Sequence, residues 1–392
     1  MKLCYLVQRV YSRITPKSSV RTRLSTTFEW LASHFDERIH HRHRFSWQKY
    51  CQKGKYVLTL SLYFIFEMKE SLILALFSIL VLNLQAQESN SAYRVLQLPT
   101  SAHVMAVGGE NITLNEDDPA LVQHNPALLT NVNAQRLGLS FLSFGERGSW
   151  GGAQYVRPFG ERHTAAAFAQ YRGYGEMTAR DEQGQALGTF SPKDIIAGVG
   201  YGYVLSDRWA GGANLKFVHE NLGDYSAAAV AVDVGLNYYD EAENLSLSMV
   251  LRNAGAQFKS FDGRLENVPH NLQIGVSKRL EHVPLRFHTT LTDLTRWSTT
   301  DYVQTDEKKL STARLVTNHF VLGVDWMPSD YITLSAGYNF RRAYEMTTLG
   351  GAHGAGFSLG AGLSFSRVKI DVAWSKQHVA SSNLMGTLSL TL

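Results

Sequence analysis

The 392-residue chain contains little cysteine and little charge. Its two cysteines, Cys4 and Cys51, both lie in the first 67 residues. From residue 68 onward, a disulfide framework or a cysteine-based metal site is therefore impossible. Only 18% of the residues are charged, whereas glycine occurs 32 times, a composition that argues against a helical enzyme. After residue 88, no apolar run reaches the length of a transmembrane helix.

The positive charge is confined to the N-terminal part. Residues 1–67 carry 12 Lys and Arg against 4 Asp and Glu, a net charge of +8. Subtraction from the totals of 38 and 34 leaves 26 basic against 30 acidic residues, or −4, for the rest of the chain. The overall isoelectric point therefore says nothing about nucleic-acid binding by the folded part, and we expect no nucleic-acid partner.

A secretory signal peptide is predicted at residues 68–87, MKESLILALFSILVLNLQAQ. Lys69 lies in a short n-region, an apolar stretch follows, and Ala86-Gln87 offers a small-residue cleavage point. We interpret Met68 as the true start and residues 1–67 as an upstream extension, so that the mature chain begins near Gln87 and is exported. The alternative is a genuine leader with a membrane segment at VLTLSLYFIF, although ten residues are too short to span a bilayer alone.

The remainder of the chain alternates with a period of two. In VKIDVAWSK, for example, Ile370, Val372 and Trp374 share one face, and Lys369 and Asp371 share the other. Such alternation is typical of β-strands with one apolar and one small or polar face. About fourteen segments show it: 136–144, 149–159, 163–178, 187–205, 208–220, 225–239, 244–253, 269–280, 284–294, 314–327, 330–341, 355–366, 368–377 and 384–392.

The connections between these segments differ in length. Every second connection is short, as at 160–162, 206–207 and 240–243, whereas 254–268, 295–313 and 342–354 are long. Short turns at one end, long loops at the other and an even strand number indicate an outer-membrane barrel. We therefore predict an all-β fold, a 14-stranded antiparallel transmembrane β-barrel over residues 136–392. With a periplasmic N-terminus, its long loops face the cell surface.

A soluble β-sandwich would also alternate, but its second face would be charged. Here the second face is mostly Gly, Ala, Ser and Thr, and barrel closure satisfies every backbone group within the hydrocarbon region. Aromatic residues gather near strand ends, as in interfacial girdles: Trp209, Tyr238, Tyr239, Trp326, Tyr331 and Phe340.

The exported part contains no catalytic sequence motif of the hydrolase, zinc-protease or P-loop type. His288 and His319 could face the lumen beside serine or acidic residues, which keeps an outer-membrane hydrolase as an alternative. We expect no enzyme activity, no catalytic residue, no cofactor and no metal. Mid-strand charges could instead form a lumen network: Asp233, Asp325, Asp371, Lys216, Arg252 and Lys369.

Aromatic residues also occur in two of the expected long loops. Phe258 and Phe261 fall in 254–268, and Trp297 and Tyr302 fall in 295–313. Exposed aromatic side chains on loops suggest a contact with a protein or glycan, so these four are candidate partner-contact residues. An ordinary surface loop is the alternative.

The stretch DDPALVQHNPALL, residues 117–129, predicts two short helical turns. Pro119 and Pro126 suit the first helical position, and each follows a residue that can cap a helix, Asp118 or Asn125. We expect these turns to be part of a structural hatch or plug, residues 88–135, in or under the barrel mouth. The side chains expected to pack it are Leu121, Val122, Leu128 and Leu129.

Residues 93–129 resemble the start of the PorQ family, outer-membrane proteins of the Bacteroidetes type IX secretion system. The matching motifs are LPTSA at 98–102, GGENITL at 108–114, DDPAL at 117–121 and NPALL at 125–129. The related PorV family and FadL-type fatty-acid transporters share a coarser version of this layout. The resemblance covers residues 88–392, although its barrel strands are individually weak.

The resemblance implies a FadL-like 14-stranded barrel and a non-enzymatic role in attaching cargo at the cell surface. It further implies PorU-, PorV- and PorZ-like protein partners, together with outer-membrane lipid and lipopolysaccharide. The alternative function is a FadL-like outer-membrane transporter of hydrophobic small molecules. That function needs an apolar site within the barrel, whereas we expect inward faces made mostly of Gly, Ser, Thr and Asp.

Overall fold

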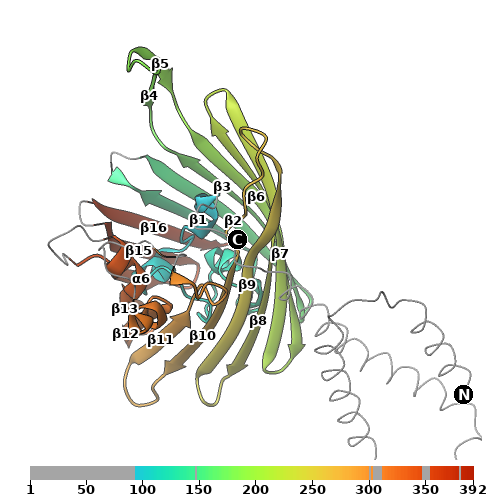
Figure 1. The fold of residues 1–392 in the computed structure, drawn as a ribbon. Coiled ribbons are helices and arrows are strands. Elements are labelled where there is room, and N and C mark those ends of the chain that lie inside the picture. The colour runs from blue at the N-terminus through green and yellow to red at the C-terminus, as the bar shows by residue number, and fades with distance from the viewer. Residues whose placement is uncertain (1–92, 146–147, 300–301, 303–310, 347–353, 379–380) are drawn as a thin grey trace, which may run out of the picture. The chain divides into compact units, whose positions relative to one another are not determined.

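The computed structural model describes residues 93–145, 148–299, 302, 311–346, 354–378 and 381–392. Fourteen antiparallel strands form a closed barrel (Figure 1), because the last strand pairs with the first from Leu384 opposite Ser143 to Thr391 opposite Arg136. The predicted 14-stranded antiparallel barrel is confirmed. Its strands are β1 (Arg136–Ser143), β2 (Ser149–Phe159), β3 (His163–Gly173), β6 (Lys193–Ser206), β7 (Trp209–Leu222), β8 (Tyr225–Asp240), β9 (Leu245–Lys259), β10 (Asn271–Arg279), β11 (Leu285–Leu291), β12 (Phe320–Ser329), β13 (Ile332–Asn339), β14 (Phe357–Ser364), β15 (Val368–His378) and β16 (Ser381–Thr391).

A further two-stranded hairpin lies between β3 and β6. Its strands, β4 (Met177–Arg180) and β5 (Ala186–Phe190), pair only with each other and project beyond the barrel rim at the top of Figure 1. The sequence predicted uninterrupted strands over 163–178 and 187–205 because the hairpin continues their alternation. In the structure, β3 ends at Gly173 and β6 begins at Lys193.

The outer face of the barrel is apolar and the inner face is small or polar. Along β14, Leu359 and Leu363 are 53% and 43% exposed, whereas Ser358 on the inner face is buried. Along β15, Val372 and Trp374 are exposed in the same way. An apolar exterior on a closed barrel is suited to bilayer hydrocarbon, which leaves no backbone group unpaired at membrane depth.

The loops at the two ends of the barrel differ as predicted, but two of the long ones contain helices. α5 (Thr312–Thr317) precedes β12, and α6 (Phe340–Glu345) follows β13. The sequence predicted strands over 314–327 and 330–341, which were too long because side chains of Ser311 and Asn339 cap helices at those points. No helix among the described residues is both long and apolar enough to cross a bilayer.

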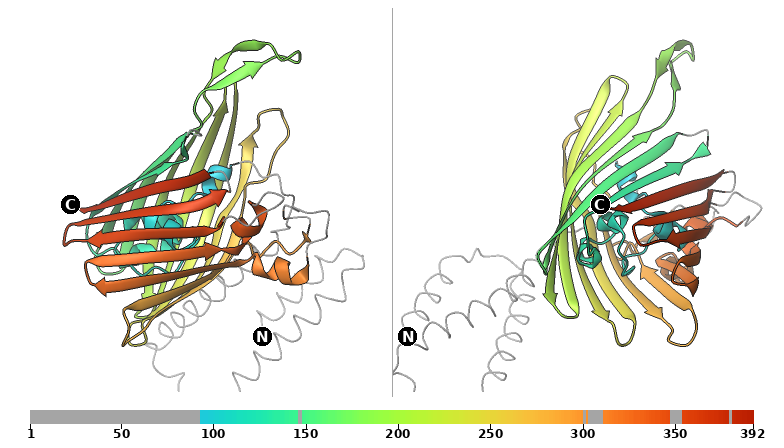
Figure 2. Two further views of the ribbon diagram at one scale, coloured as in Figure 1. Left: turned by 90° about the vertical axis from the view of Figure 1, so that its left-hand side faces the viewer. Right: turned by 180° about the vertical axis from the view of Figure 1, so that it is seen from behind.

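Four short helices precede the first strand and lie within the barrel, as the two views of Figure 2 show. They are η2 (Arg94–Gln97), α4 (Ala102–Ala106), η3 (Pro119–Gln123) and η4 (Pro126–Asn131), of which η2, η3 and η4 are 3₁₀ helices. We call residues 93–135 the hatch. The predicted extension at 1–67, the predicted signal peptide at 68–87 and hatch residues 88–92 lie outside the described residues.

Candidate functional site

The two proline-initiated turns of the hatch are capped by their own side chains. Asp118 accepts a hydrogen bond from the Ala120 N–H at 2.9 Å, and Asn125 accepts one from the Ala127 N–H at 2.9 Å. Each proline follows directly, where its missing N–H leaves no donor unsatisfied. Residues within and directly before η3 and η4 are therefore sufficient to explain why these turns form. Their apolar side chains are buried in the barrel interior: Leu121, Val122, Leu128 and Leu129.

Glycines on the inner wall provide the space in which the hatch backbone lies. A Cβ at Gly212 would lie 2.4 Å from the backbone carbonyl of Pro126, and a Cβ at Gly235 would lie 2.2 Å from the Asn125 Oδ1. The same holds directly after α4, since a Cβ at Gly337 would lie 2.2 Å from the backbone of Val107 and Gly108. Real side chains cannot occupy such positions, so the glycine-rich inner face is shaped to the hatch.

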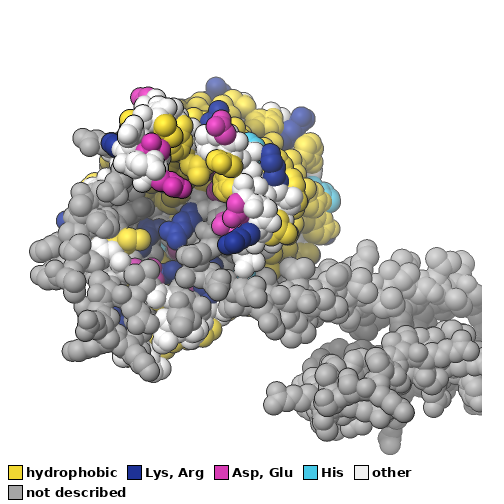
Figure 3. Space-filling model, turned by 45° about the horizontal axis from the view of Figure 1, so that its top comes forward, with side chains coloured by type: hydrophobic (Ala, Val, Ile, Leu, Met, Phe, Trp, Pro, Cys, Tyr) yellow, Lys and Arg dark blue, Asp and Glu magenta, His cyan; other side chains and the backbone are white. Residues whose placement is uncertain are grey.

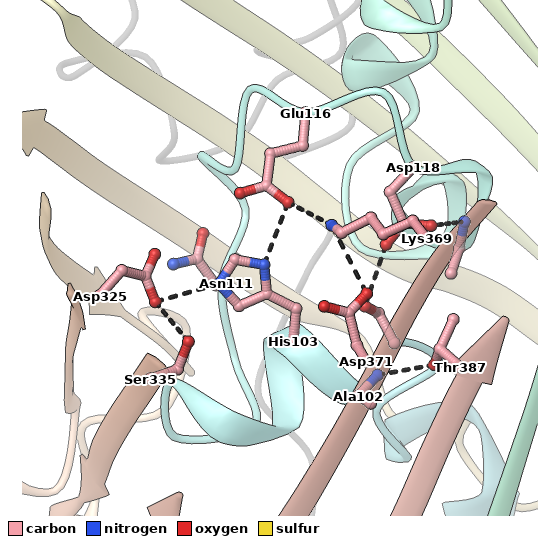
Figure 4. A network of polar contacts seen from close by, with 12 residues as sticks. Ala102, His103, Asn111, Glu116, Asp118, Asp325, Ser335, Lys369, Asp371 and Thr387 are labelled. Atoms are coloured by element: carbon pink, nitrogen blue, oxygen red, sulfur yellow. Dashed lines mark hydrogen bonds and ion pairs between the residues drawn. The ribbon is translucent and has the colours of Figure 1, made fainter. Parts of the chain in front are cut away.

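A buried network of charged groups joins α4 and the following hatch loop to the wall. His103 lies between two carboxylates, with Nδ1 3.0 Å from Glu116 and Nε2 3.0 Å from Asp325 of β12 (Figure 4). Lys369 of β15 reaches Glu116 at 2.6 Å, and Arg286 of β11 contacts both Glu116 and Asp325. Two hatch residues are thereby tied to three wall strands, and we call this set the hatch latch.

The geometry requires His103 to be charged. Both ring nitrogens face carboxylate oxygens, and only the imidazolium ion can donate from both. Burial by itself lowers the pKa of His103, but the carboxylates of Glu116 and Asp325 outweigh it and raise that pKa to about 10. The three cations His103, Arg286 and Lys369 are thus packed among carboxylates. These are Glu116, Asp325, Asp371 and the neighbouring Asp118.

The trio His103, Glu116 and Asp325 has metal-ligand residue types, with candidate ligand atoms within 4.8 Å of one another. Both ring nitrogens of His103, however, already face carboxylate oxygens and act as donors to them, which leaves no nitrogen lone pair for an ion. Both carboxylates also contact Arg286, which neutralises them. The arrangement fits an ion-pair network better than a metal centre.

A serine, a histidine and an aspartate do meet within the barrel. The Ser277 hydroxyl lies 2.5 Å from His288 Nδ1, and His288 Nε2 lies 2.8 Å from Asp325. All three side chains are buried, the Thr113 hydroxyl of the hatch covers Ser277, and Asp325 already belongs to the hatch latch. Because the three side chains are buried and bonded to the hatch and the hatch latch, we interpret this trio as structural.

A second buried ionic group lies against β7, β8 and β9. The Lys216 ammonium is 2.7 Å from Asp233, and Arg252 is 3.0 Å from Glu110 of the hatch. The mid-strand charges Asp233, Asp325, Asp371, Lys216, Arg252 and Lys369 thus all face inward, as the sequence indicated. Next to them, burial and the charges of Arg252 and Lys216 hold the pKa of His124 well below its usual value.

The four candidate partner-contact aromatics occupy different environments. Phe258 is a strand residue of β9, not a loop residue, and its exposed ring lies 6.1 Å from that of Phe217 on the outer wall. Phe261 is partly buried and packs against the apolar interior. The expectation that both are presented on a loop surface is therefore wrong for Phe258 and only partly met by Phe261.

Trp297 and Tyr302 also differ from each other. Trp297 is exposed, with its indole N–H donating to the Leu294 carbonyl at 2.7 Å. Tyr302 is buried, edge-on to His319 at 5.9 Å and with Arg341 5.0 Å from its ring centre. Tyr302 was expected to be exposed, and that expectation is wrong, because its ring packs inside the rim of the barrel.

The inner face is more apolar than the sequence suggested. Trp150, Phe168, Ile196 and Val218 all face inward and pack, with hatch residues including Tyr93, in one buried cluster. The sequence predicted mostly Gly, Ser, Thr and Asp inside. The alternating pattern hid these residues because β2, β3, β6 and β7 carry apolar groups on both faces.

Comparison with known proteins gives a fold likeness only. No protein-family model and no curated protein matches the sequence. Among solved structures, the toluene transporter TodX of Pseudomonas putida is 12% identical, with a TM-score of 0.49, over 74% of this chain and 96% of that chain. A FadL homologue of Pseudomonas aeruginosa is 10% identical, with a TM-score of 0.45, over 74% and 97%. The CymD monoaromatic hydrocarbon channel is 14% identical, with a TM-score of 0.46, over 76% and 98%.

At such low sequence identities, the solutes named for those proteins cannot be assigned to this chain. What this chain's own residues define is its class: an integral outer-membrane β-barrel of fourteen strands, closed, apolar outside, and filled by an N-terminal hatch.

Proposed function

We propose that this protein is a non-enzymatic outer-membrane component of the type IX secretion system. It anchors the cell-surface attachment complex, with PorU-, PorV- and PorZ-like partners, that processes secreted cargo and attaches it to lipopolysaccharide. The motifs LPTSA, GGENITL, DDPAL and NPALL support the proposal at the level of the PorQ resemblance.

The observation that carries the proposal is how the hatch fills the barrel. Its backbone lies on wall glycines such as Gly212 and Gly337, and the hatch latch ties His103 and Glu116 to the wall. A barrel filled in this way serves as a rigid membrane anchor. Partner contacts then fall to the long loops and to the β4–β5 hairpin, which projects beyond the rim.

Co-purification tests the proposal. The tagged full chain would be isolated from native membranes in a mild detergent, with an unrelated barrel of the same membrane as control. We expect PorZ- and PorU-like proteins to co-purify only with this chain, and cargo to remain unprocessed in a deletion strain. Absence of these partners, together with normal cargo processing after deletion, would refute the proposal.

The inward apolar cluster favours a second function, a FadL-like transporter of hydrophobic small molecules. Trp150, Phe168 and Ile196 place apolar surface inside the barrel beside the hatch. In that case, deletion would abolish uptake of a long-chain fatty acid and leave cargo secretion intact. Trp150→Gln would reduce uptake in the same assay, with Trp209→Gln on the exposed outer wall as the matched control.

A further inference from the structure

The long-loop end of the barrel is hollowed, and Lys and Arg side chains lie inside the hollow (Figure 3). Two described elements bring guanidinium groups to the inner side near this end. They are helix α6, with Arg341 and Arg342, and the middle of β9, with Arg252. Arg252 and Arg342 both contact the hatch turn at 108–110. The contacts of these guanidinium groups show which of their N–H groups have no acceptor in the described part of the chain.

Arg342 of α6 is a partly buried cation with no carboxylate partner within 4.0 Å among the described residues. Its guanidinium lies against Gly109, where a Cβ would be 2.4 Å from Nη1, and it donates one long bond of 3.3 Å to the Gly108 carbonyl. Burial lowers the pKa of Arg342, against the opposing charge of Glu110. An uncompensated buried charge of this kind is costly without a partner.

Arg252 converges on the same hatch turn from the wall. It is paired with Glu110 at 3.0 Å, while its buried Nε has no hydrogen-bond partner in the described part of the chain. Because Glu110 directly follows Gly109, the guanidinium groups of Arg252 and Arg342 flank one three-residue turn. Gln273, also bonded to Glu110 at 2.9 Å, keeps that carboxylate in place.

The rim around this turn adds positive charge. Arg341 is paired with Asp293 and Glu345, and Arg314 lies 4.5 Å from the centre of the Tyr344 ring. Together, the hatch turn, Arg252, the loop segments 293–299 and 311–318, and α6 carry five arginines against three acids, a net +2. They are Arg252, Arg296, Arg314, Arg341 and Arg342, against Glu110, Asp293 and Glu345.

We propose that Arg252 and Arg342 form the floor of an anion site that binds a phosphate group presented from the long-loop end. Two planar guanidinium groups on separate elements suit an anion with several oxygens, whereas a carboxylate is satisfied by one such group. The phosphate is either part of a phosphorylated glycolipid headgroup or free in solution. The site does not depend on the proposed secretion function.

Binding to the purified full chain in detergent, followed by calorimetry, tests the site. The probes are inorganic phosphate, a phosphorylated lipid A and, as comparison, acetate. We expect phosphate to bind and acetate not to, and Arg342→Gln to weaken phosphate binding by about tenfold or more, since bonds to charged groups are the strong ones. Arg208→Gln, at an exposed ion pair on the short-turn end, is the matched control and leaves binding unchanged.

The affinities of the protein for lipid A and for inorganic phosphate distinguish the two possible sources of the phosphate group. Tight binding of lipid A with weak binding of inorganic phosphate, both reduced by Arg342→Gln, assigns the site to the headgroup, and the reverse order assigns it to the free ion. Equal binding by wild type and Arg342→Gln, or equal binding of acetate and phosphate, would overturn the proposal. If Arg342→Gln does not fold, Arg342→Lys carries the test: the loss of the planar donors weakens binding several-fold, and unchanged binding counts against the site.

Discussion

At the scale of single residues, His103 determines the charge balance of the hatch latch. Its pKa is 6.5 when unperturbed and about 10 in the folded protein. A raised folded pKa means that the stabilisation is fully present below about pH 6.5 and is lost as the pH rises through about 10. We therefore predict that amide-exchange protection factors of residues 102–116 fall between pH 7 and pH 10.5, as measured by mass spectrometry.

A variant of His103 tests whether this residue, and not another titratable group of the hatch latch, causes the pH dependence. The charged or titratable side chains packed around His103 are Glu116, Arg286, His288, Asp325, Lys369 and Asp371. We expect His103→Ala to remove the pH dependence and to lower hatch stability by about 3–5 kcal/mol, the cost of breaking a buried pair. His282→Ala, in a turn at the opposite end from the long loops, should change neither. Persistence of the pH dependence in His103→Ala would show that another group causes it.

Gly337 is a second residue whose role can be tested singly. Its missing Cβ leaves room for the backbone of Val107 and Gly108, which cannot rotate away as a side chain could. We predict that Gly337→Ala costs about 1–3 kcal/mol in the free energy of unfolding, the usual cost of overpacking, as measured by urea titration in detergent. Gly386→Ala is the control, because a Cβ there would meet nothing within 4 Å. Equal stability of the two variants would mean that the hatch backbone does not depend on this space.

At the scale of elements, alternation predicted the strands because each barrel strand has one face in lipid and one face inside. The predicted strand bounds were wrong at the β4–β5 hairpin, where the alternation continues beyond the barrel rim. They were also wrong where a capped helix replaces the end of a strand, as at Ser311 and Asn339. Local capping chemistry was readable at Asp118 and Asn125, since their contacts lie two residues away.

The hatch latch was not predictable from the sequence. His103 and Asp325 are 222 positions apart, and their contact depends on barrel closure and on where the hatch lies inside. One signal was present, since His103 is the lone ionisable residue between Leu98 and Gly109. Without the strand register, however, nothing in the sequence selected its partners. The mid-strand acids and bases were placed correctly inside, but not paired.

The capped turns of the hatch give a prediction at this scale. Asn125→Ala removes the cap of η4 and also the bond from Asn125 Nδ2 to the Ile112 carbonyl at 2.9 Å. We expect a loss of about 1–2 kcal/mol in unfolding free energy, together with faster amide exchange in residues 126–131. Asp262→Ala removes a comparable cap, to the Arg264 N–H at 3.0 Å, from an exposed loop and should have little effect. A hatch that exchanges at the wild-type rate in Asn125→Ala would contradict a stabilising role for the cap.

At the scale of the whole molecule, the lengths of the loops predict the orientation of the barrel in the membrane. Short turns at one end and long loops at the other are the pattern in which the long loops face outward. The chain offers a clean test because it has no cysteine after Cys51, so expression from Met68 gives a cysteine-free background. Single cysteines would then be placed at exposed positions of the two ends: Gln183→Cys in the β4–β5 hairpin and Ala242→Cys in the β8–β9 turn.

We predict that a membrane-impermeant maleimide labels Gln183→Cys on intact cells. Ala242→Cys should react only after the outer membrane is permeabilised, because the β8–β9 turn then lies on the periplasmic side. Both positions are exposed, so a difference in reactivity reports the side of the membrane and not burial. Labelling of Ala242→Cys on intact cells would show that the barrel has the opposite orientation, with the short turns at the cell surface. It would also place the arginine-lined hollow on the periplasmic side, where a cell-surface phosphoglycolipid cannot enter it.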